Sequence, residues 1–318
     1  MEADDTMLPD VELITLVGIT FFAATVNGAL GYGFSSLTVP VALLYYPNRV
    51  LSPALVLVEV VVNSYTLLVN RKSLQKIWRR VLPILFGLIP GIIAGSYALS
   101  QAHPEWLRLL TYAILLPLIL LQAAGLRRPI RSERAIGVPF GAGVGALYSV
   151  TTISGPPLAL MFNNQGFVKE EFRAALGLIR VVESALTAIA YYFIGLYSVE
   201  SAQILFSIVP SVIIGLPLGA YIIRRLNAET FRRICMSFDA WVVGFGLSRV
   251  LIDLTLIASP TAYSVWLAVI LLDFYLLYVF FRGRHGMGAA TLAAPVPDGD
   301  LSVRWQKRSS AAPNDVRL

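Results

Sequence analysis

The sequence predicts an all-α polytopic membrane protein made of two related halves of opposite topology. Each half is expected to hold a broken, re-entrant helical hairpin and three transmembrane helices, and one extra span follows. Three observations support this fold class. Of the 318 residues, 57% are hydrophobic and only 14% are charged, whereas soluble domains carry about 25% charged residues. Glycine and proline interrupt two of the apolar segments. Basic clusters separate the segments and indicate their direction of crossing.

The first apolar segment, 11–44, contains a helix break at Asn27-Gly-Ala-Leu-Gly-Tyr-Gly-Phe-Ser-Ser-Leu-Thr-Val-Pro40. Its glycines admit backbone angles that other residues avoid, and Pro40 has no amide donor. Irregular backbone at membrane depth is tolerated only where protein buries it or a cavity wets it. The break therefore predicts part of a substrate path. The alternative for its glycines is close helix packing.

Three uninterrupted apolar segments follow, at 51–70, 81–99 and 109–126. Each offers the ~20 residues that a helix needs to cross the hydrocarbon core. Lys and Arg cluster after the first of them, at 71–80, and after the third, at 127–134. Because cytoplasmic loops are enriched in these residues, both clusters are assigned to the cytoplasm.

The second half repeats this order. Segment 135–168 is interrupted at Gly141-Ala-Gly-Val-Gly-Ala-Leu-Tyr-Ser-Val-Thr-Thr-Ile-Ser-Gly-Pro-Pro157. Counting back from the basic tail after residue 282 places both ends of this segment in the cytoplasm. We therefore expect a re-entrant hairpin, with a single tilted and kinked span as the alternative. The remaining apolar segments are 174–196, 204–223, 234–251 and 262–281.

The same count places the N-terminus outside and the C-terminus in the cytoplasm. The halves align through Gly28 with Gly145 and Pro40 with Pro157, and Gly91 and Gly95 align with Gly215 and Gly219. Inverted repeats with broken helices place a substrate site at the midplane between them. The predicted organisation is an extracytoplasmic segment at 1–10, a first repeat at 11–126, a cytoplasmic linker at 127–134, a second repeat at 135–252, an additional helix at 260–282 and a disordered cytoplasmic tail at 283–318.

The composition also narrows the function classes. The net charge of +6 lies in short loops between apolar segments, which indicates topology signals and contact with membrane lipid, not a nucleic-acid partner. The single cysteine, Cys235, leaves no internal disulfide and no cysteine metal cage. With only His103 and His285 as histidines, and no nucleophile–base or carboxylate–histidine motif, we expect no metal, no cofactor and no enzymatic activity. The acidic N-terminus lacks a basic signal region, so the first apolar segment is expected in the mature protein.

The stretch from Asn27 to Ser35, leading to Val39-Pro40, resembles the first-repeat signature of the TauE/SafE sulfite exporter family. The turn Ser154-Gly-Pro-Pro157 resembles its second-repeat counterpart. The resemblance covers roughly residues 10 to 252 and implies a plasma-membrane transporter. The substrate that it implies is a small organosulfur or sulfur-oxoanion compound, such as a sulfonate, sulfite or sulfoacetate, moved in either direction. It leaves the oligomeric state open.

An anion site can be built at the two breaks, because a helix N-terminus offers free amides and about half a positive charge. The neighbouring hydroxyls would add donors. The predicted substrate-binding residues are Asn27, Gly31, Gly33, Ser35, Ser36 and Thr38 in the first hairpin, Tyr148, Ser149, Thr151, Thr152, Ser154 and Gly155 in the second, and Arg180 in segment 174–196.

Charged residues inside a membrane are rare and usually functional. Arg180 is the predicted fixed positive charge, because a planar guanidinium can hold two oxyanion oxygens. The alternative is a structural ion pair of Arg180 with Glu183 or Glu59. Asp239 and Asp273 lie nearer span ends, so interfacial snorkelling or pairing is expected for them.

Glu59, Glu183 and Asn63 are the predicted coupling residues, with a proton as the candidate coupling ion. Export of an anion from a negative interior is downhill by ~2.3 kcal/mol per charge and 100 mV, whereas import needs coupling. An anion channel of the same architecture is the alternative function.

Overall fold

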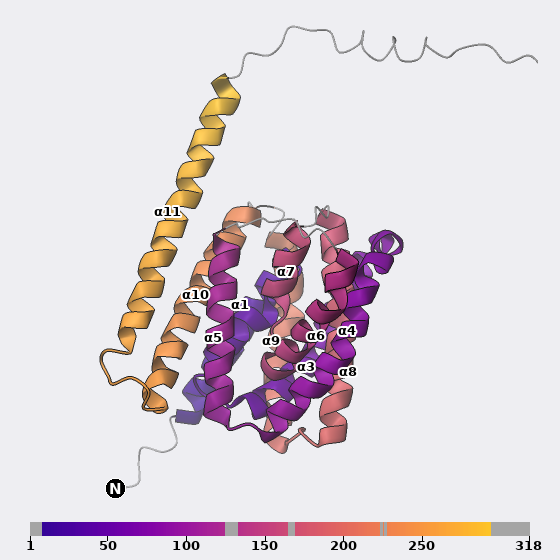
Figure 1. The fold of residues 1–318 in the computed structure, drawn as a ribbon, viewed down its shortest axis with the longest axis vertical. Coiled ribbons are helices and arrows are strands. Elements are labelled where there is room, and N and C mark those ends of the chain that lie inside the picture. Colours follow the sequence, from indigo (N-terminus) through magenta and orange to yellow (C-terminus); the bar gives the residue numbers. More distant parts are fainter. Residues whose placement is uncertain (1–7, 125–132, 165–168, 223–224, 226–227, 294–318) are drawn as a thin grey trace, which may run out of the picture. The chain divides into compact units, whose positions relative to one another are not determined.

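The computed structural model describes residues 8–124, 133–164, 169–222, 225 and 228–293. The predictions for the N-terminal segment up to residue 7, for most of the linker at 127–134 and for the tail beyond residue 293 lie outside this part. The described part is all-helical and contains no strand (Figure 1). The helices are α1 (Leu8–Leu30), α2 (Phe34–Ala42), α3 (Asn48–Val69), η1 (Arg71–Ser73), α4 (Leu74–Gln101), α5 (Pro104–Ala123), α6 (Glu133–Thr151), α7 (Gly155–Asn164), α8 (Lys169–Ile194), α9 (Val199–Ile222), α10 (Ala228–Asp253) and α11 (Tyr263–Ala293).

Eight of these helices are long and apolar enough to cross a membrane. The prediction of an all-α polytopic membrane protein is therefore confirmed. The chain divides into two compact units after Leu276. The first unit holds α1 to α10 and the start of α11, and it contains every site discussed below.

Both predicted interruptions are present, but their two limbs are unequal. The first lies between α1 and α2, where Gly31 and Gly33 adopt positive φ angles of 83° and 107°. The second lies between α6 and α7, where Thr152 has a φ of 57°. In the first hairpin α1 alone offers 20 residues for a span, whereas α2 has nine. The first hairpin, expected as a re-entrant pair of half-helices, therefore has one limb long enough to span and one short limb.

Contacts between the helices fix their directions. Ser201 at the start of α9 donates to the carbonyl of Val50 at the start of α3 over 2.8 Å, so these helices begin at the same end of the bundle. Asn48 of α3 and Thr111 of α5 are hydrogen-bonded at that end too. In contrast, Asn63 contacts Arg180 of α8, and Leu67, farther along α3, meets the earlier Gly177. Helix α8 therefore runs antiparallel to α3.

Two close helix–helix contacts at glycines, here called the glycine seams, join the halves. A Cβ atom at Gly215 or Gly219 of α9 would collide with the backbone of α1 near Phe21 and Thr25. A Cβ at Gly87 or Gly91 of α4 would collide in the same way with α6 near Val138 and Ala142. In both seams the contacts advance together along the chain, so each pair of helices is parallel. Glycine is required because only a bare Cα permits such close approach.

These seams correct the alignment of the halves. Gly91 occupies the position of Gly219, not of Gly215, and Gly87 is the counterpart of Gly215. Pro40 and Pro157 are not equivalent either, because Pro40 lies near the end of α2 and Pro157 near the start of α7. Both breaks are three residues long, at 31–33 and 152–154, so the difference does not come from their length. With these corrections, helices α1 to α5 and α6 to α10 have matching packing partners and opposite directions, as an inverted repeat would have.

An ion pair attaches α11 to α10. The guanidinium of Arg233 lies 2.8 Å from the carboxylate of Asp273, which also accepts from the indole of Trp241 over 3.1 Å. Asp273 is fully buried, and Asp239 is only 7% exposed. The pairing considered for Asp273 is therefore present, whereas the burial of Asp239 differs from an interfacial, snorkelling position.

Replacing Asp273 with alanine is expected to destabilise the protein by ~3–5 kcal/mol, because the buried guanidinium of Arg233 would lose its counter-ion. Thermal unfolding in detergent measures this loss. Asp253→Asn, at the exposed end of α10, is the matched control. Equal melting temperatures for Asp273→Ala and the control would contradict the assigned role.

Candidate functional site

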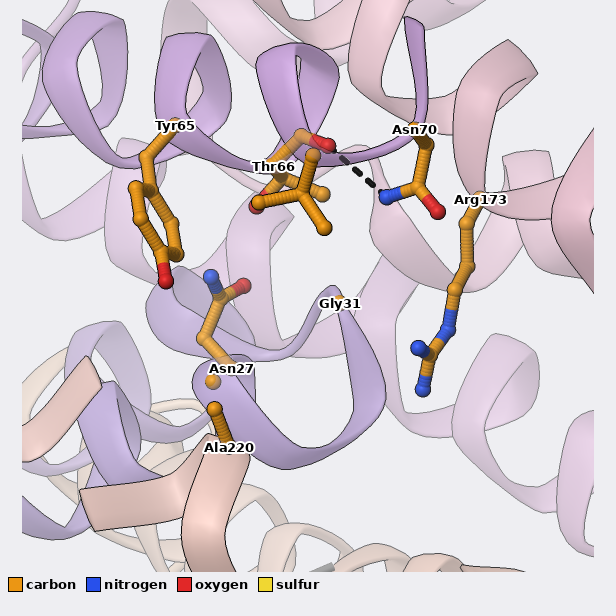
Figure 2. A pocket seen from close by; sticks show the side chains of 9 residues that line it. Asn27, Gly31, Tyr65, Thr66, Asn70, Arg173 and Ala220 are labelled. Carbon is orange, nitrogen blue, oxygen red and sulfur yellow. Dashed lines mark hydrogen bonds between the residues drawn. The ribbon is translucent and has the colours of Figure 1, made fainter. Parts of the chain in front are cut away.

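A cavity of about 300 Å³ opens at the end of the bundle where α3 and α9 finish. Figure 2 shows Asn27 and Gly31 of the first hairpin facing Thr66 and Asn70 of α3 across this space. Arg173 of α8 reaches the same place and donates to the carbonyl of Ala29 over 3.0 Å, at the end of α1. Both side-chain polar atoms of Asn27 are buried and without a hydrogen-bond partner. We call this space the vestibule.

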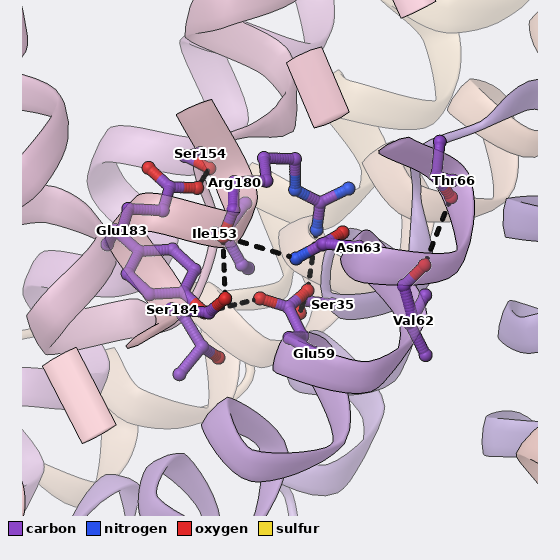
Figure 3. A network of polar contacts seen from close by, with 12 residues as sticks. Ser35, Glu59, Val62, Asn63, Thr66, Ile153, Ser154, Arg180, Glu183 and Ser184 are labelled. Carbon is purple, nitrogen blue, oxygen red and sulfur yellow. Dashed lines mark hydrogen bonds and ion pairs between the residues drawn. The ribbon is translucent and has the colours of Figure 1, made fainter. Parts of the chain in front are cut away.

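Deeper along α3, a buried ion pair connects the two halves (Figure 3). Arg180 Nη2 lies 2.5 Å from Glu59 Oε1, and the two side chains are 2% and 0% exposed. The hydroxyl of Tyr148, from α6, donates to Glu59 Oε2 over 2.6 Å. Ser35, from α2, donates to Glu59 Oε1. Of the two ion pairs considered from the sequence, the structure forms the one with Glu59.

This ion pair leaves donors unused. Nε and Nη1 of Arg180 are buried and without a partner. A second buried carboxyl group lies beside the second break, where Glu183 accepts from Ser154 through Oε1 while its Oε2 has no partner. Asn63 and Ser184 both donate to the carbonyl of Arg180, over 3.5 and 2.6 Å. The cluster therefore combines a guanidinium with free donors and two carboxyl groups.

Not all predicted binding residues reach this cluster. The hydroxyls of Ser149 and Thr151 donate to carbonyls one turn earlier in α6, each over 2.8 Å. Thr152 donates to the carbonyl of Thr151. Thr38 is buried without a partner, and Ser36 lines a different cavity together with Gly33. Gly155 supplies the first residue of α7. Because Pro156 and Pro157 have no amide hydrogen and Leu158 donates to the carbonyl of Ser154, only the amide of Gly155 is left as a donor in this first turn.

At the opposite end, where α3 begins, side chains fill the space. Tyr148 and Tyr191 are fully buried in an apolar cluster with Val56 and Leu99. Tyr191 donates to the carbonyl of Ser149 over 2.5 Å. Arg49 donates to the carbonyls at the end of α4. Side chains therefore close this end of the bundle, whereas the vestibule opens at the other end.

The sequence reasoning missed the outer wall of the vestibule. Thr66 and Asn70 were not singled out, although they follow Asn63 at helical spacing on one face of α3. That spacing could have revealed them. Arg173 was not singled out either. Its contact with α1 depends on tertiary packing, which the residues next to it in the sequence do not indicate.

Helices of membrane length, two of them broken beside a buried ion pair and a one-sided cavity, define a membrane transporter. The family model described as "Sulfite exporter TauE/SafE" matches residues 16–245, and the chain belongs to this family. One curated relative, "Probable sulfite/organosulfonate exporter TauE" of Cupriavidus necator, is 28% identical over 253 residues, which are 78% of this chain and 96% of the relative. No solved structure matches the chain. The predicted family is confirmed, and members of it are transporters, not enzymes.

Proposed function

We propose that the protein is a secondary transporter that moves a small sulfur-containing anion, such as a sulfonate, sulfite or sulfoacetate, across the plasma membrane by alternating access. One observation carries this proposal: Arg180 is a buried cation with two unused donor nitrogens, paired with Glu59 between the two halves of the chain. The family and the printed name of the relative support the choice of a sulfur oxoanion.

Arg180 would recognise the anion in competition with Glu59. In the structure a Glu59 oxygen takes one guanidinium nitrogen, and an incoming oxyanion would bind Nη1 and displace that carboxylate in part. Ser35 and Tyr148 would hold the displaced carboxylate in place, since both already donate to it. Guanidinium–oxyanion bonds are charge-assisted and therefore strong.

The coupling residues inside this site would be Glu59 and Glu183, with Asn63 fixing the backbone of Arg180. A carboxylate that loses its partner in a low-dielectric interior is strongly disfavoured unless it takes up a proton. Displacement of Glu59 by substrate would therefore favour protonation of Glu59 or Glu183. This chemistry makes a proton the coupling ion that the site fits best.

The conformation would be open to the cytoplasm. The vestibule lies at the end of α3 that Arg71 and the basic cluster at 71–80 follow, and positive clusters favour the cytoplasmic side. Opposite directions of the two halves support an inverted repeat, in which the open and covered ends exchange during transport. A channel would need a path past Tyr148 and Tyr191 as well, and their burial favours the carrier.

Flux measurements on the purified protein in liposomes test the proposal. Labelled sulfite, sulfoacetate, taurine and toluenesulfonate would be offered under pH and voltage gradients. We expect saturable transport of at least one of them, faster when a second anion is present on the opposite side. Absence of saturable flux for all four under every gradient would overturn the proposal, and unitary currents would favour the channel.

A cysteine placed in the vestibule is expected to react from the cytoplasmic side only. Val69 lines the vestibule, so Val69→Cys should be modified by a membrane-impermeant thiol reagent, and modification should block transport. Val61→Cys is the control, since Val61 is equally exposed on α3 but does not line the vestibule. The native Cys235 is buried and should add little background. Labelling of Val69→Cys from the outer side alone would reverse the assigned orientation.

A further inference from the structure

A second, smaller cavity lies beside α2, lined by apolar side chains and a few polar ones. Its volume is about 20 Å³, enough for a single water molecule. Ser36 of α2, Gln122 of α5 and Asp239 of α10 line it, together with Tyr32 and Gly33 of the first break. Polar side chains of three helices and the hinge of the first hairpin therefore meet at one small space.

Asp239 has no counter-ion in the part of the chain that the structure describes. Its side chain is 7% exposed and its Oδ1 has no hydrogen-bond partner. The amide nitrogen of Gln122, also 7% exposed, has no partner either. This differs from Asp273, which is paired with Arg233. A buried carboxyl group inside a membrane is costly and is usually retained for a function.

The groups around Asp239 favour a proton over a metal cation. Arg232 and Cys235 of α10 and Tyr32 of the hinge are the titratable or charged neighbours that line the cavity, while α2, α5 and α7 contribute only Ser36, Leu37, Ile119, Gln122 and Pro156. A guanidinium on the same wall opposes binding of a metal cation. Room for one water molecule also leaves no space for a set of oxygen ligands.

Helix α2 connects this cavity with the anion site. Ser35 donates to Glu59, whereas its neighbour Ser36 lines the Asp239 cavity. The helix has only nine residues and starts at the left-handed Gly33. A small movement of α2 can therefore respond to Asp239 and change the contacts of Glu59 in one step.

We propose that Asp239 is a further proton-binding residue that coupling requires beside Glu59 and Glu183, and that α2 transmits its charge state to the Arg180–Glu59 pair. A proton from water in the cavity would bind Oδ1, which converts the carboxylate to a neutral acid able to donate to its neighbours. Loss of the proton would leave a carboxylate that attracts the amide of Gln122 and the hydroxyl of Ser36, and the pull on Ser36 would move α2. This inference rests on the proposed function and adds a proton site outside the anion site.

Asp239→Asn mimics the neutral acid and separates coupling from binding. With labelled methanesulfonate, a monovalent anion, a gradient of one pH unit should give about tenfold accumulation by the wild type at one proton per anion. For Asp239→Asn we expect accumulation to fall to about onefold while exchange of labelled for unlabelled anion persists. Asp253→Asn on the same helix is the control and should accumulate as the wild type does. Gradient-driven accumulation by Asp239→Asn that equals the wild type would overturn the inference, as would loss of coupling only in Glu59→Gln or Glu183→Gln.

An infrared pH titration tests the same residue without any substrate. The wild type and Asp253→Asn should show a protonated-carboxyl band that titrates and that Asp239→Asn lacks. If that band is assigned to Asp239 but no anion is transported, the result contradicts the proposed function and leaves the proton site at Asp239 unaffected. If anion transport is present but Asp239→Asn loses no carboxyl band, the result contradicts the inference about Asp239 and leaves the proposed function unaffected.

Discussion

Arg180→Ala is expected to abolish anion binding and transport. The substitution removes the buried guanidinium that is proposed to attract the oxyanion, and it leaves Glu59 buried without its ion-pair partner. Loss of one member of a buried pair costs about 3–5 kcal/mol of stability. Binding would be measured by thermal shift with sulfite and methanesulfonate, and transport by liposome flux.

A double substitution separates the two roles of Arg180. In Arg180→Met with Glu59→Leu, both charges are replaced by apolar groups, which is often neutral or stabilising for a buried pair. We expect stability near that of the wild type and still no transport. Recovery of transport in this double variant would show that the pair is purely structural. Arg180→Lys keeps the charge but loses the planar guanidinium, so we expect weak binding.

Gly219→Ala and Gly91→Ala are expected to have the largest effects on folding. An added methyl group would collide with the backbone of Thr25 in the first case and of Ala142 in the second. Backbone atoms cannot move aside as side chains can, so we expect a loss at or above the ~1–3 kcal/mol typical of overpacked cores. Yield of monodisperse protein and thermal unfolding in detergent measure this loss.

Gly143→Ala is the matched control, because a Cβ atom at Gly143 meets nothing within 4 Å. It lies on α6, next to Ala142 and within the same glycine-rich stretch. We expect it to fold as the wild type does. Because alanine has a higher helix propensity than glycine, a loss in Gly143→Ala as large as in Gly91→Ala would contradict the assignment of the loss to backbone collision.

The spans and the two breaks could be predicted from the sequence because a membrane imposes strict rules on helix length and on irregular backbone. Arg180 and Glu59 were identifiable for a related reason, since charge at this depth is rare. The roles of individual hydroxyls were less predictable. Ser149 and Thr151 donate to the preceding turn of their own helix, which is the nearest acceptor available to any helical hydroxyl. The sequence alone does not distinguish them from Ser35.

Asp239 shows a different limit of sequence reasoning. It lies six residues into segment 234–251, which suggested an interfacial position. Its burial depends on neighbours from α2 and α5, which are distant in the chain. Position along a span estimates depth in the membrane, but not whether other helices cover the side chain. The same limit applies to Arg173, whose partner Ala29 lies in the other half of the chain.

The glycine seams have a mechanical consequence. Because backbone touches backbone between α1 and α9, and between α4 and α6, each of these pairs can shift only as one stiff body. Each pair takes one helix from each half of the chain. In the proposed alternating-access cycle the moving bodies would therefore be these two helix pairs and not the two halves, with α3 and α8 between them carrying Glu59 and Arg180. Bending would then be confined to the hinges at residues 31–33 and 152–154, where the backbone already leaves the helical conformation.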